Sequence, residues 1–341
     1  MKNIYLLTVL FVFITISNYA QKKPLDHTVY DQWQSIGERL ISDDGQYIAF
    51  QVNPQEGDGV LIINSLKGLS SIKIERGYNA VFTDNYRYLI CKIKPLFSET
   101  REAKIKKKKP DEMPKDSLAI VELSTGICTK VPRVKSFKIP EENATTLAYL
   151  MEKSSSEISS EEGTNLIIKN LINGDSAVYP LVSEYFFNKK GTVLLWETTK
   201  KAKDSLSKAT VVLSDLIAKK SAVILQGFND AKSYSMDEDG RQLAFVAERD
   251  SSVKALQKFY QLYYYKVNTD SAVMMVNQFT SGMPDRSTVS EFSNIGFSKS
   301  GKRLFFGTAP VLPVKDTSLP EFERVNVDVW APMTIIFSRF N

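Results

Sequence analysis

Two kinds of hairpin-like sequence alternate along this chain, and this alternation constrains its fold more than any other feature. The first kind has a Gly, Asn or Asp turn followed by a run in which apolar residues alternate with polar ones. It occurs at residues 42–52 (SDDGQYIAFQV), 82–93, 187–198, 236–248 and 297–308, with a weaker copy at 140–152. A turn next to a run with period-two alternation indicates a β-hairpin. The chain is therefore predicted to be rich in antiparallel strands.

The second kind of sequence falls between copies of the first and consists of two β-rich runs across a short polar turn. It occurs at residues 59–74 (GVLIINSLKGLSSIKI), 117–132, 165–180, 209–225 and 260–276. The two kinds alternate at intervals of roughly 40 to 65 residues, so each repeat supplies four strands. Units of this kind are typical of β-propeller blades, whereas the alternative, a long β-sandwich, does not require strict alternation.

We therefore predict an all-β protein, a β-propeller of four-stranded antiparallel blades. The repeats give about five complete blades and an interrupted sixth, which predicts an incomplete ring. The propeller is assigned to residues 42–330, preceded by a lead-in segment at 21–41 and followed by an atypical tail at 331–341. The tail lacks the polar turn and return strand that a blade needs. Since an open array exposes apolar faces and strand edges, this ending suggests a truncated product.

The N-terminal segment has the layout of a secretory signal peptide. Lys2 precedes an apolar run at residues 4–16, and small and polar residues follow up to Ala20. The run is shorter than the roughly 20 apolar residues that span a bilayer, which makes an uncleaved anchor the less favoured alternative. We predict cleavage after Ala20, export to the periplasm or the extracellular space, and no membrane span in the mature chain.

Composition and rare residues exclude several classes of function. A hydrophobic content of 43% and a charged content of 24% are typical of a globular protein. The net charge of +5 is mild and partly concentrated at residues 106–109 (KKKK), so no nucleic-acid partner is predicted. Cys91 and Cys128 allow either one disulfide or two free thiols. With His27 the only histidine, no Cys/His metal site can be assembled, and no cofactor is predicted.

A further set of segments consists of residues 23–36, 52–63 (VNPQEGDGVLII), 93–120, 243–250 (LAFVAERD) and 307–311 (GTAPV). These segments resemble exported prolyl oligopeptidase-family serine peptidases of Bacteroidetes-type bacteria, and the similarity extends from about residue 23 to 330. The resemblance implies an N-terminal β-propeller that screens or admits peptides. It also implies a C-terminal α/β-hydrolase domain that carries the catalytic triad. The implied partners are thus peptides and a missing or separate hydrolase domain.

The chain departs from this family at the catalytic residues. The family's nucleophile lies in a G-x-S-x-G elbow, and the nearest segment here is GFSKSG at 296–301, where Ser300 occupies the position of the second glycine. That segment is also a repeat turn, which favours a hairpin role for Ser300. A triad needs a histidine, and His27 lies before the first repeat. No catalytic residue is assigned, and the chain alone is predicted to be inactive.

Two pairs of glutamates are candidate substrate-binding residues. The dipeptidyl peptidase branch of the family uses paired propeller glutamates to hold the free amino group of its substrate. Glu141–Glu142 and Glu161–Glu162 are adjacent pairs, although neither has the aromatic-flanked motif of that branch and solvated loops are the alternative. Two functions remain open: the peptide-admitting propeller portion of a secreted serine peptidase, and a stand-alone binding or scaffold propeller of the envelope.

Overall fold

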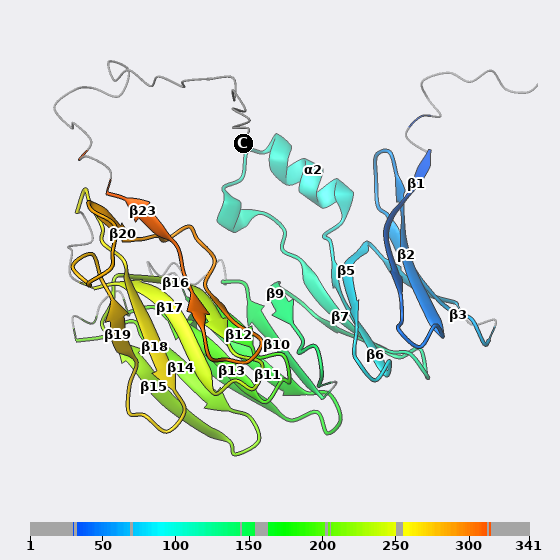
Figure 1. Ribbon diagram of the computed structural model, residues 1–341. Helices are drawn as coiled ribbons and strands as arrows, with labels where there is room; N and C mark the ends of the chain where they lie inside the picture. Colours follow the sequence, from blue (N-terminus) through cyan, green and yellow to red (C-terminus); the bar gives the residue numbers. More distant parts are fainter. Residues whose placement is uncertain are drawn as a thin grey trace, which may run out of the picture. The chain divides into compact units, whose positions relative to one another are not determined.

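The structure is a computed structural model, and it consists almost entirely of antiparallel β-strands (Figure 1). It describes residues 30, 33–68, 71–143, 145–153, 163–201, 204, 206–249, 255–311 and 314. The chain divides into two compact units, residues 1–203 and 204–341, and each is described by itself. No described helix is long and apolar enough to cross a membrane.

Unit 1 contains three successive sheets whose strands follow chain order. The first sheet is β1-β2-β3-β4, the second is β5-β6-β7-β8, and the third begins with β9-β10-β11-β12 and continues to β13. The strands are β1 (Gln34–Ile41), β2 (Tyr47–Pro54), β3 (Val60–Ser65), β4 (Ser71–Glu75), β5 (Gly77–Phe82), β6 (Tyr88–Ile93), β7 (Ser117–Glu122), β8 (Cys128–Val131), β9 (Val134–Lys138), β10 (Thr146–Met151), β11 (Thr164–Asn170), β12 (Ser176–Phe187) and β13 (Val193–Thr198).

The first three sheets pack face to face through apolar side chains that alternate along each strand. In β6, Leu89, Cys91 and Ile93 belong to the core shared with the first sheet. Their neighbours Tyr88 and Ile90 belong to the core shared with the third sheet. Because successive side chains of a strand point to opposite faces, one strand serves two cores. This is how neighbouring propeller blades bury both faces of each small sheet.

Strand β12 is 12 residues long and serves two blades. Its first half pairs with β11, and its second half pairs with β13. The register shifts near Leu181, whose φ of 60° is unusual for a residue other than glycine. The strand therefore completes the third blade and begins the fourth, with no connecting loop between them.

Unit 2 contains one complete four-stranded sheet and several shorter pairings. Strands β16-β17-β18-β19 form the sheet, β14 and β15 form a hairpin, and the sixth repeat forms the pairs β20-β23 and β21-β22. The strands are β14 (Thr210–Asp215), β15 (Lys220–Gln226), β16 (Asp230–Met236), β17 (Gln242–Glu248), β18 (Gln261–Lys266), β19 (Val273–Val276), β20 (Ser287–Val289), β21 (Gly296–Phe297), β22 (Leu304–Phe305) and β23 (Thr308–Pro310). Phe297 and Leu304 pack against buried Val246 and Leu262 of the complete sheet.

These sheets confirm the predicted fold class, all-β with four-stranded antiparallel blades. The first, second, third and fifth predicted blades each lie within one unit, while the boundary between the units divides the strands of the fourth. The sixth is interrupted, as predicted, because its described strands form only two-stranded pairs. The incomplete ring stays a prediction, because it depends on the relative placement of the two units.

One boundary needs correction. Residues 21–41 were predicted to be a lead-in segment, yet residues 34–41 form β1, the first strand of the first blade. The sequence QSIGERLI hides this strand because its register shifts between Ile36 and Arg39, which breaks the simple alternation. The predicted signal peptide and His27 lie outside the described residues.

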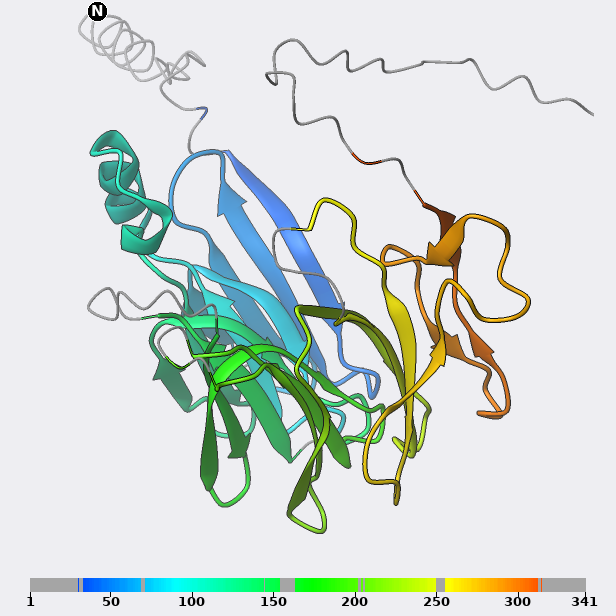
Figure 2. The same cartoon turned by 90° about the vertical axis from the view of Figure 1, so that its left-hand side faces the viewer.

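The insertion at residues 94–117 contains the one described α-helix, α2 (Phe97–Ile105), and a 3₁₀ turn at Pro110–Glu112. Ala103 is the only buried residue of this helix. In Figures 1 and 2, α2 lies at one end of the strands of unit 1.

The two cysteines are free thiols that share the core of the first two blades. Cys91 lies on β6 and Cys128 on β8, with β7 paired between them. Neighbouring strands lie about 4.8 Å apart, so residues two strands apart are too distant for a disulfide. Burial, with smaller contributions from the nearby Cys128 and Glu38, raises the pKa of the Cys91 thiol to about 12.

We expect this thiol to make the folded protein less stable in alkali. The unfolded thiol ionises near pH 9, whereas folded Cys91 keeps its proton up to about pH 12. Between these values the unfolded chain binds fewer protons, so the free energy of unfolding falls by up to about 1.4 kcal/mol per pH unit. Urea unfolding at about pH 8 and pH 10 should show a smaller decrease for Cys91→Ala than for the wild type. An identical decrease in both would contradict the buried-thiol explanation.

Candidate functional site

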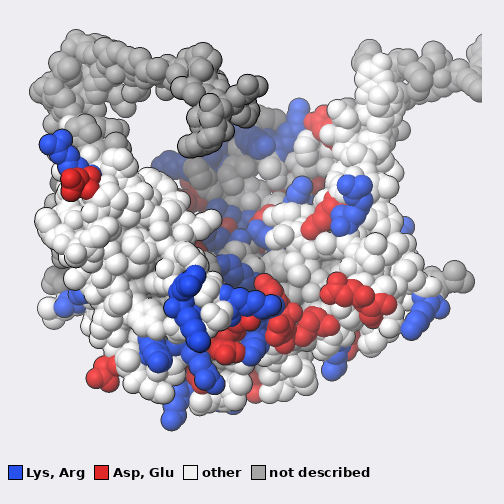
Figure 3. Space-filling view, in the orientation of Figure 1, with Lys and Arg blue, Asp and Glu red and all other residues white. Residues whose placement is uncertain are grey.

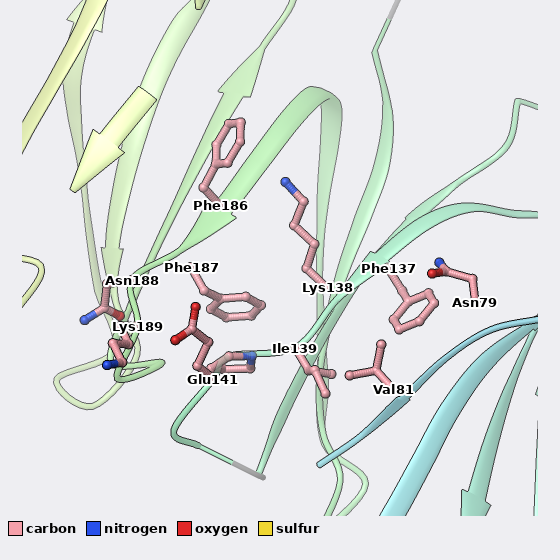
Figure 4. A pocket seen from close by; sticks show the side chains of 11 residues that line it. Asn79, Val81, Phe137, Lys138, Ile139, Glu141, Phe186, Phe187, Asn188 and Lys189 are labelled. Atoms are coloured by element: carbon pink, nitrogen blue, oxygen red, sulfur yellow. The ribbon is translucent and has the colours of Figure 1, made fainter. Parts of the chain in front are cut away.

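A cavity of about 390 Å³ opens in unit 1 on the first strands of three consecutive blades (Figure 4). Its walls come from β5, from β9 with the turn that follows it, and from the end of β12 with its turn. The lining residues are Asn79, Val81, Phe137, Lys138, Ile139, Pro140, Glu141, Phe186, Phe187, Asn188 and Lys189. In the view of Figure 4, Lys138 and Ile139 lie between the side chains contributed by β12 and those contributed by β5, and Glu141 lies beside Phe187 on the side of Lys189.

Local backbone irregularities give these strands their position at the cavity. In β5 the register shifts between Tyr78 and Val81, and Asn79 between them has a φ of 49°. Such a bulge bends a strand and redirects its side chains. Asn79 and Val81 are two residues apart on this bulged strand, and both line the cavity.

The apolar part of the wall is aromatic. Phe137 lies on β9, and Phe186 and Phe187 are consecutive at the end of β12. All three are partly buried, so their rings are packed on one side and accessible on the other. Aromatic rings in this position can bind an apolar side chain through burial of its surface.

Lys138 places a partly dehydrated ammonium group in the same wall. Its Nζ donates a hydrogen bond to the backbone oxygen of Tyr185 (2.7 Å) and lies 3.9 Å from the ring centroid of Phe186. Among the described residues it forms no ion pair. Burial lowers the pKa of this lysine, and the nearby carboxylate of Glu184 partly opposes the shift.

The predicted glutamates have different positions. Glu141 lines the cavity and makes no hydrogen bond or ion pair with a described residue. Glu142 is outside the lining, and its carboxylate lies 3.4 Å from Nζ of Lys189. Glu161 and Glu162 lie outside the described residues. A substrate contact by any of the four stays a prediction, but Glu141 is the member that faces a cavity.

Sequence reasoning missed the other lining residues. Phe186 and Phe187 belong to the run YFFNKK directly before a repeat turn, and Phe137 and Lys138 lie at the equivalent place one blade earlier. The recurrence of aromatic and basic residues at the start of successive blades was the sequence signal that could have indicated this cavity. Using this signal requires knowing that the first strands of successive blades lie side by side.

Ser300 and the lysines at residues 106–109 do not line this cavity. Ser300 lies in the turn between β21 and β22, where its Oγ is 3.3 Å from Oγ of Ser298. Residues 106–109 follow α2 and are exposed, and Lys106 pairs with Glu102 at 2.5 Å. On the face drawn in Figure 3, Lys and Arg side chains lie beside Asp and Glu side chains. The described residues contain no cluster of three or more His, Cys, Asp or Glu suited to a metal ion.

No protein-family profile matches this sequence, and no curated protein matches it. Solved structures are similar to it at low identity. The β-propeller domain of the Trilobed protease from Pyrococcus furiosus is 11% identical, with a TM-score of 0.42, over 82% of this chain and 79% of that one. The acylaminoacyl peptidase of Pyrococcus horikoshii is 8% identical, with a TM-score of 0.42, over 84% of this chain and 44% of that one.

An oligogalacturonate lyase from Vibrio parahaemolyticus is also similar, at 13% identity and a TM-score of 0.41, over 79% of this chain and 72% of that one. The structural neighbours thus include propeller domains of peptidases together with a lyase. At these identities and TM-scores the similarity assigns no activity to this chain.

Proposed function

We propose that this chain is the propeller portion of an exported prolyl oligopeptidase-like serine peptidase. In this role it binds peptides and admits them to an α/β-hydrolase domain that carries the catalytic triad, in a longer or separate chain. The observation that supports the proposal best is the cavity on the first strands of three blades. It combines the carboxylate of Glu141, which has no partner among the described residues, with three phenylalanine rings.

This combination suits the amino-terminal end of a peptide. An ammonium group can pair with Glu141, and an apolar first side chain can lie against Phe137, Phe186 and Phe187. A charged hydrogen bond of this kind contributes about 1.5–3 kcal/mol when it is sheltered and less when it is exposed. Lys138 also lines the cavity and repels an ammonium group, which favours placing that group at Glu141.

The proposal is tested by removing one charge at a time. Isothermal titration calorimetry of the full chain should show binding of Phe-Ala-Ala-amide with a free amino group. We expect roughly tenfold weaker binding of the N-acetylated form, because acetylation removes the cation. Glu141→Gln should abolish this preference, since the glutamine is neutral but similar in size.

Glu142→Gln is the matched variant, because Glu142 neighbours Glu141 but lies outside the cavity lining. It should retain the preference for the free amino group. Equal binding of the free and acetylated peptides by the wild type would rule out this mode of recognition.

A stand-alone binding or scaffold propeller of the envelope is the second candidate. It is favoured by the fact that all the residues lining the cavity lie within unit 1, so that binding needs no hydrolase domain. The two candidates are separated by the genomic DNA downstream of the codon for Asn341. A G-x-S-x-G segment with a following Asp and His, in frame or after a single frameshift, supports the peptidase. If the downstream region encodes no such segment, the stand-alone binding or scaffold propeller is the remaining candidate.

A further inference from the structure

A second cavity in unit 1, of about 260 Å³, lies between helix α2 and the loop that joins β2 to β3. It is lined by Gln51, Asn53, Gly57, Asp58, Gly59, Arg76, Lys94, Pro95, Phe97 and Thr100. The backbone N–H of Phe97 donates to Oδ1 of Asp58 (2.9 Å), which ties the first turn of the helix to the loop. The cavity is thus formed by connected elements of one unit and shares no lining residue with the first cavity.

Two cations of this lining have no anionic partner among the described residues. Arg76 donates through Nε to the backbone oxygen of Lys94 (3.0 Å), so its two terminal nitrogens remain available. Nζ of Lys94 lies 5.2 Å from the ring centroid of Tyr78 and makes no ion pair. Asp58 is the one acidic residue of the lining. Two cations and one anion leave a net charge of +1 around the cavity.

Arg133 of the next blade shows which contacts of Arg76 serve the strand structure and which feature is specific to the cavity. Arg133 precedes the first strand of the next blade and has the same φ of 60° as Arg76. The backbone oxygen of Arg133 accepts from the N–H of Glu152 (2.8 Å), and that of Arg76 accepts from the N–H of Lys94 (3.0 Å). Each donor directly follows the second strand of its blade. The guanidinium of Arg133 also donates to a backbone oxygen at that strand end, that of Lys153. Both arginines therefore fasten one strand end to the next strand. Arg76 additionally lines a cavity, to which the insertion carrying α2 contributes Pro95, Phe97 and Thr100.

We propose that this cavity binds the carboxylate of a small acid or of a peptide C-terminus. The terminal nitrogens of an arginine form a planar fork that matches a carboxylate, and Nε of Arg76 is already fixed in orientation. Lys94 adds a second positive charge, and the first turn of α2, which begins at Phe97, faces the cavity with the positive end of its dipole. A single negative charge balances the surplus of +1. The volume is near the lower end for ligand pockets, roughly 300 Å³, which favours a small ligand.

The test uses three probes on the full chain in isothermal titration calorimetry. N-acetyl-alanine carries the carboxylate, N-acetyl-alaninamide lacks it, and inorganic phosphate offers a different oxyanion. We expect N-acetyl-alanine to bind and N-acetyl-alaninamide to show no measurable binding. The affinity for N-acetyl-alanine should fall as the salt concentration is raised. Binding of acid and amide alike, or of neither, would overturn the proposal. Tighter binding of phosphate than of the acid would overturn the carboxylate assignment.

Arg76→Lys and Arg133→Lys form the matched pair of variants. Both alter the same strand fastening, but only Arg76→Lys removes the fork from the cavity. We expect Arg76→Lys to weaken binding of N-acetyl-alanine about tenfold and Arg133→Lys to leave it unchanged. Equal effects of the two would show that the arginine acts through strand structure alone. Glu141→Gln should not change acid binding, so this proposal and the proposed function can fail independently.

Discussion

Leu89→Ala is expected to lower the free energy of unfolding of unit 1 by about 3 kcal/mol, within the usual range of about 2 to 5 kcal/mol for buried leucine. Leu89 lies on β6, has no exposed surface, and packs in the core shared by the first two blades. Truncation removes apolar surface from burial and leaves a cavity that rigid neighbouring strands cannot fill. The loss therefore exceeds that expected from the lost transfer free energy alone.

Urea unfolding followed by tryptophan fluorescence can measure this loss, because Trp196 of unit 1 is buried. Leu66→Ala is the matched control, since Leu66 is 60% exposed in the turn between β3 and β4. It should shift the midpoint little. If both variants had the same midpoint as the wild type, the packing of the first blade against the second would be wrong.

Gly191→Ala is expected to have the second largest effect, a loss of roughly 2 to 4 kcal/mol, from two separate causes. Gly191 lies in the turn between β12 and β13 with a φ of 64°, a left-handed conformation in which a Cβ atom is strained. The new Cβ would also lie 2.5 Å from Cβ and Cγ of Pro140. The Pro140 ring is fixed to its own backbone, so it cannot move away without displacing the backbone beside the candidate peptide site.

Gly45→Ala separates these two causes. Gly45 occupies the corresponding turn of the first blade with a φ of 65°, and a Cβ there would meet no atom within 4 Å. It should lose only about 1 kcal/mol, the cost of the left-handed conformation. The difference between the two variants in urea unfolding measures the clash with Pro140. A difference near zero would mean that the turn relaxes freely.

The repeat turns were the part of the fold that the sequence predicted best. Even the weak copy at residues 140–152 is a blade hairpin, with Asn143 ordering its turn and β10 following. Turn residues and period-two alternation are local signals, and each blade reuses them. Strand β1 was missed because its register shift breaks the alternation.

The candidate sites were harder to predict, because they join residues from different blades. Of the first cavity only Glu141 was foreseen, since Lys138 and Phe186 come together only when successive first strands lie side by side. Arg76 and Lys94 likewise meet at the adjoining ends of the paired strands β5 and β6, and the inserted helix adds to the lining of their cavity. No local pattern encodes such contacts, and single charged residues in strands resemble ordinary surface positions.

The shared strand β12 limits how the first cavity can change shape. Lys138 on β9 and Phe186 on β12 belong to one continuous hydrogen-bonded sheet from β9 to β12, with no loop between the third blade and the start of the fourth. These two walls are therefore linked through paired strands of one sheet. The wall carrying Asn79 and Val81 belongs to a separate sheet. We therefore expect the cavity to widen mainly by sliding or tilting of the second blade against the third.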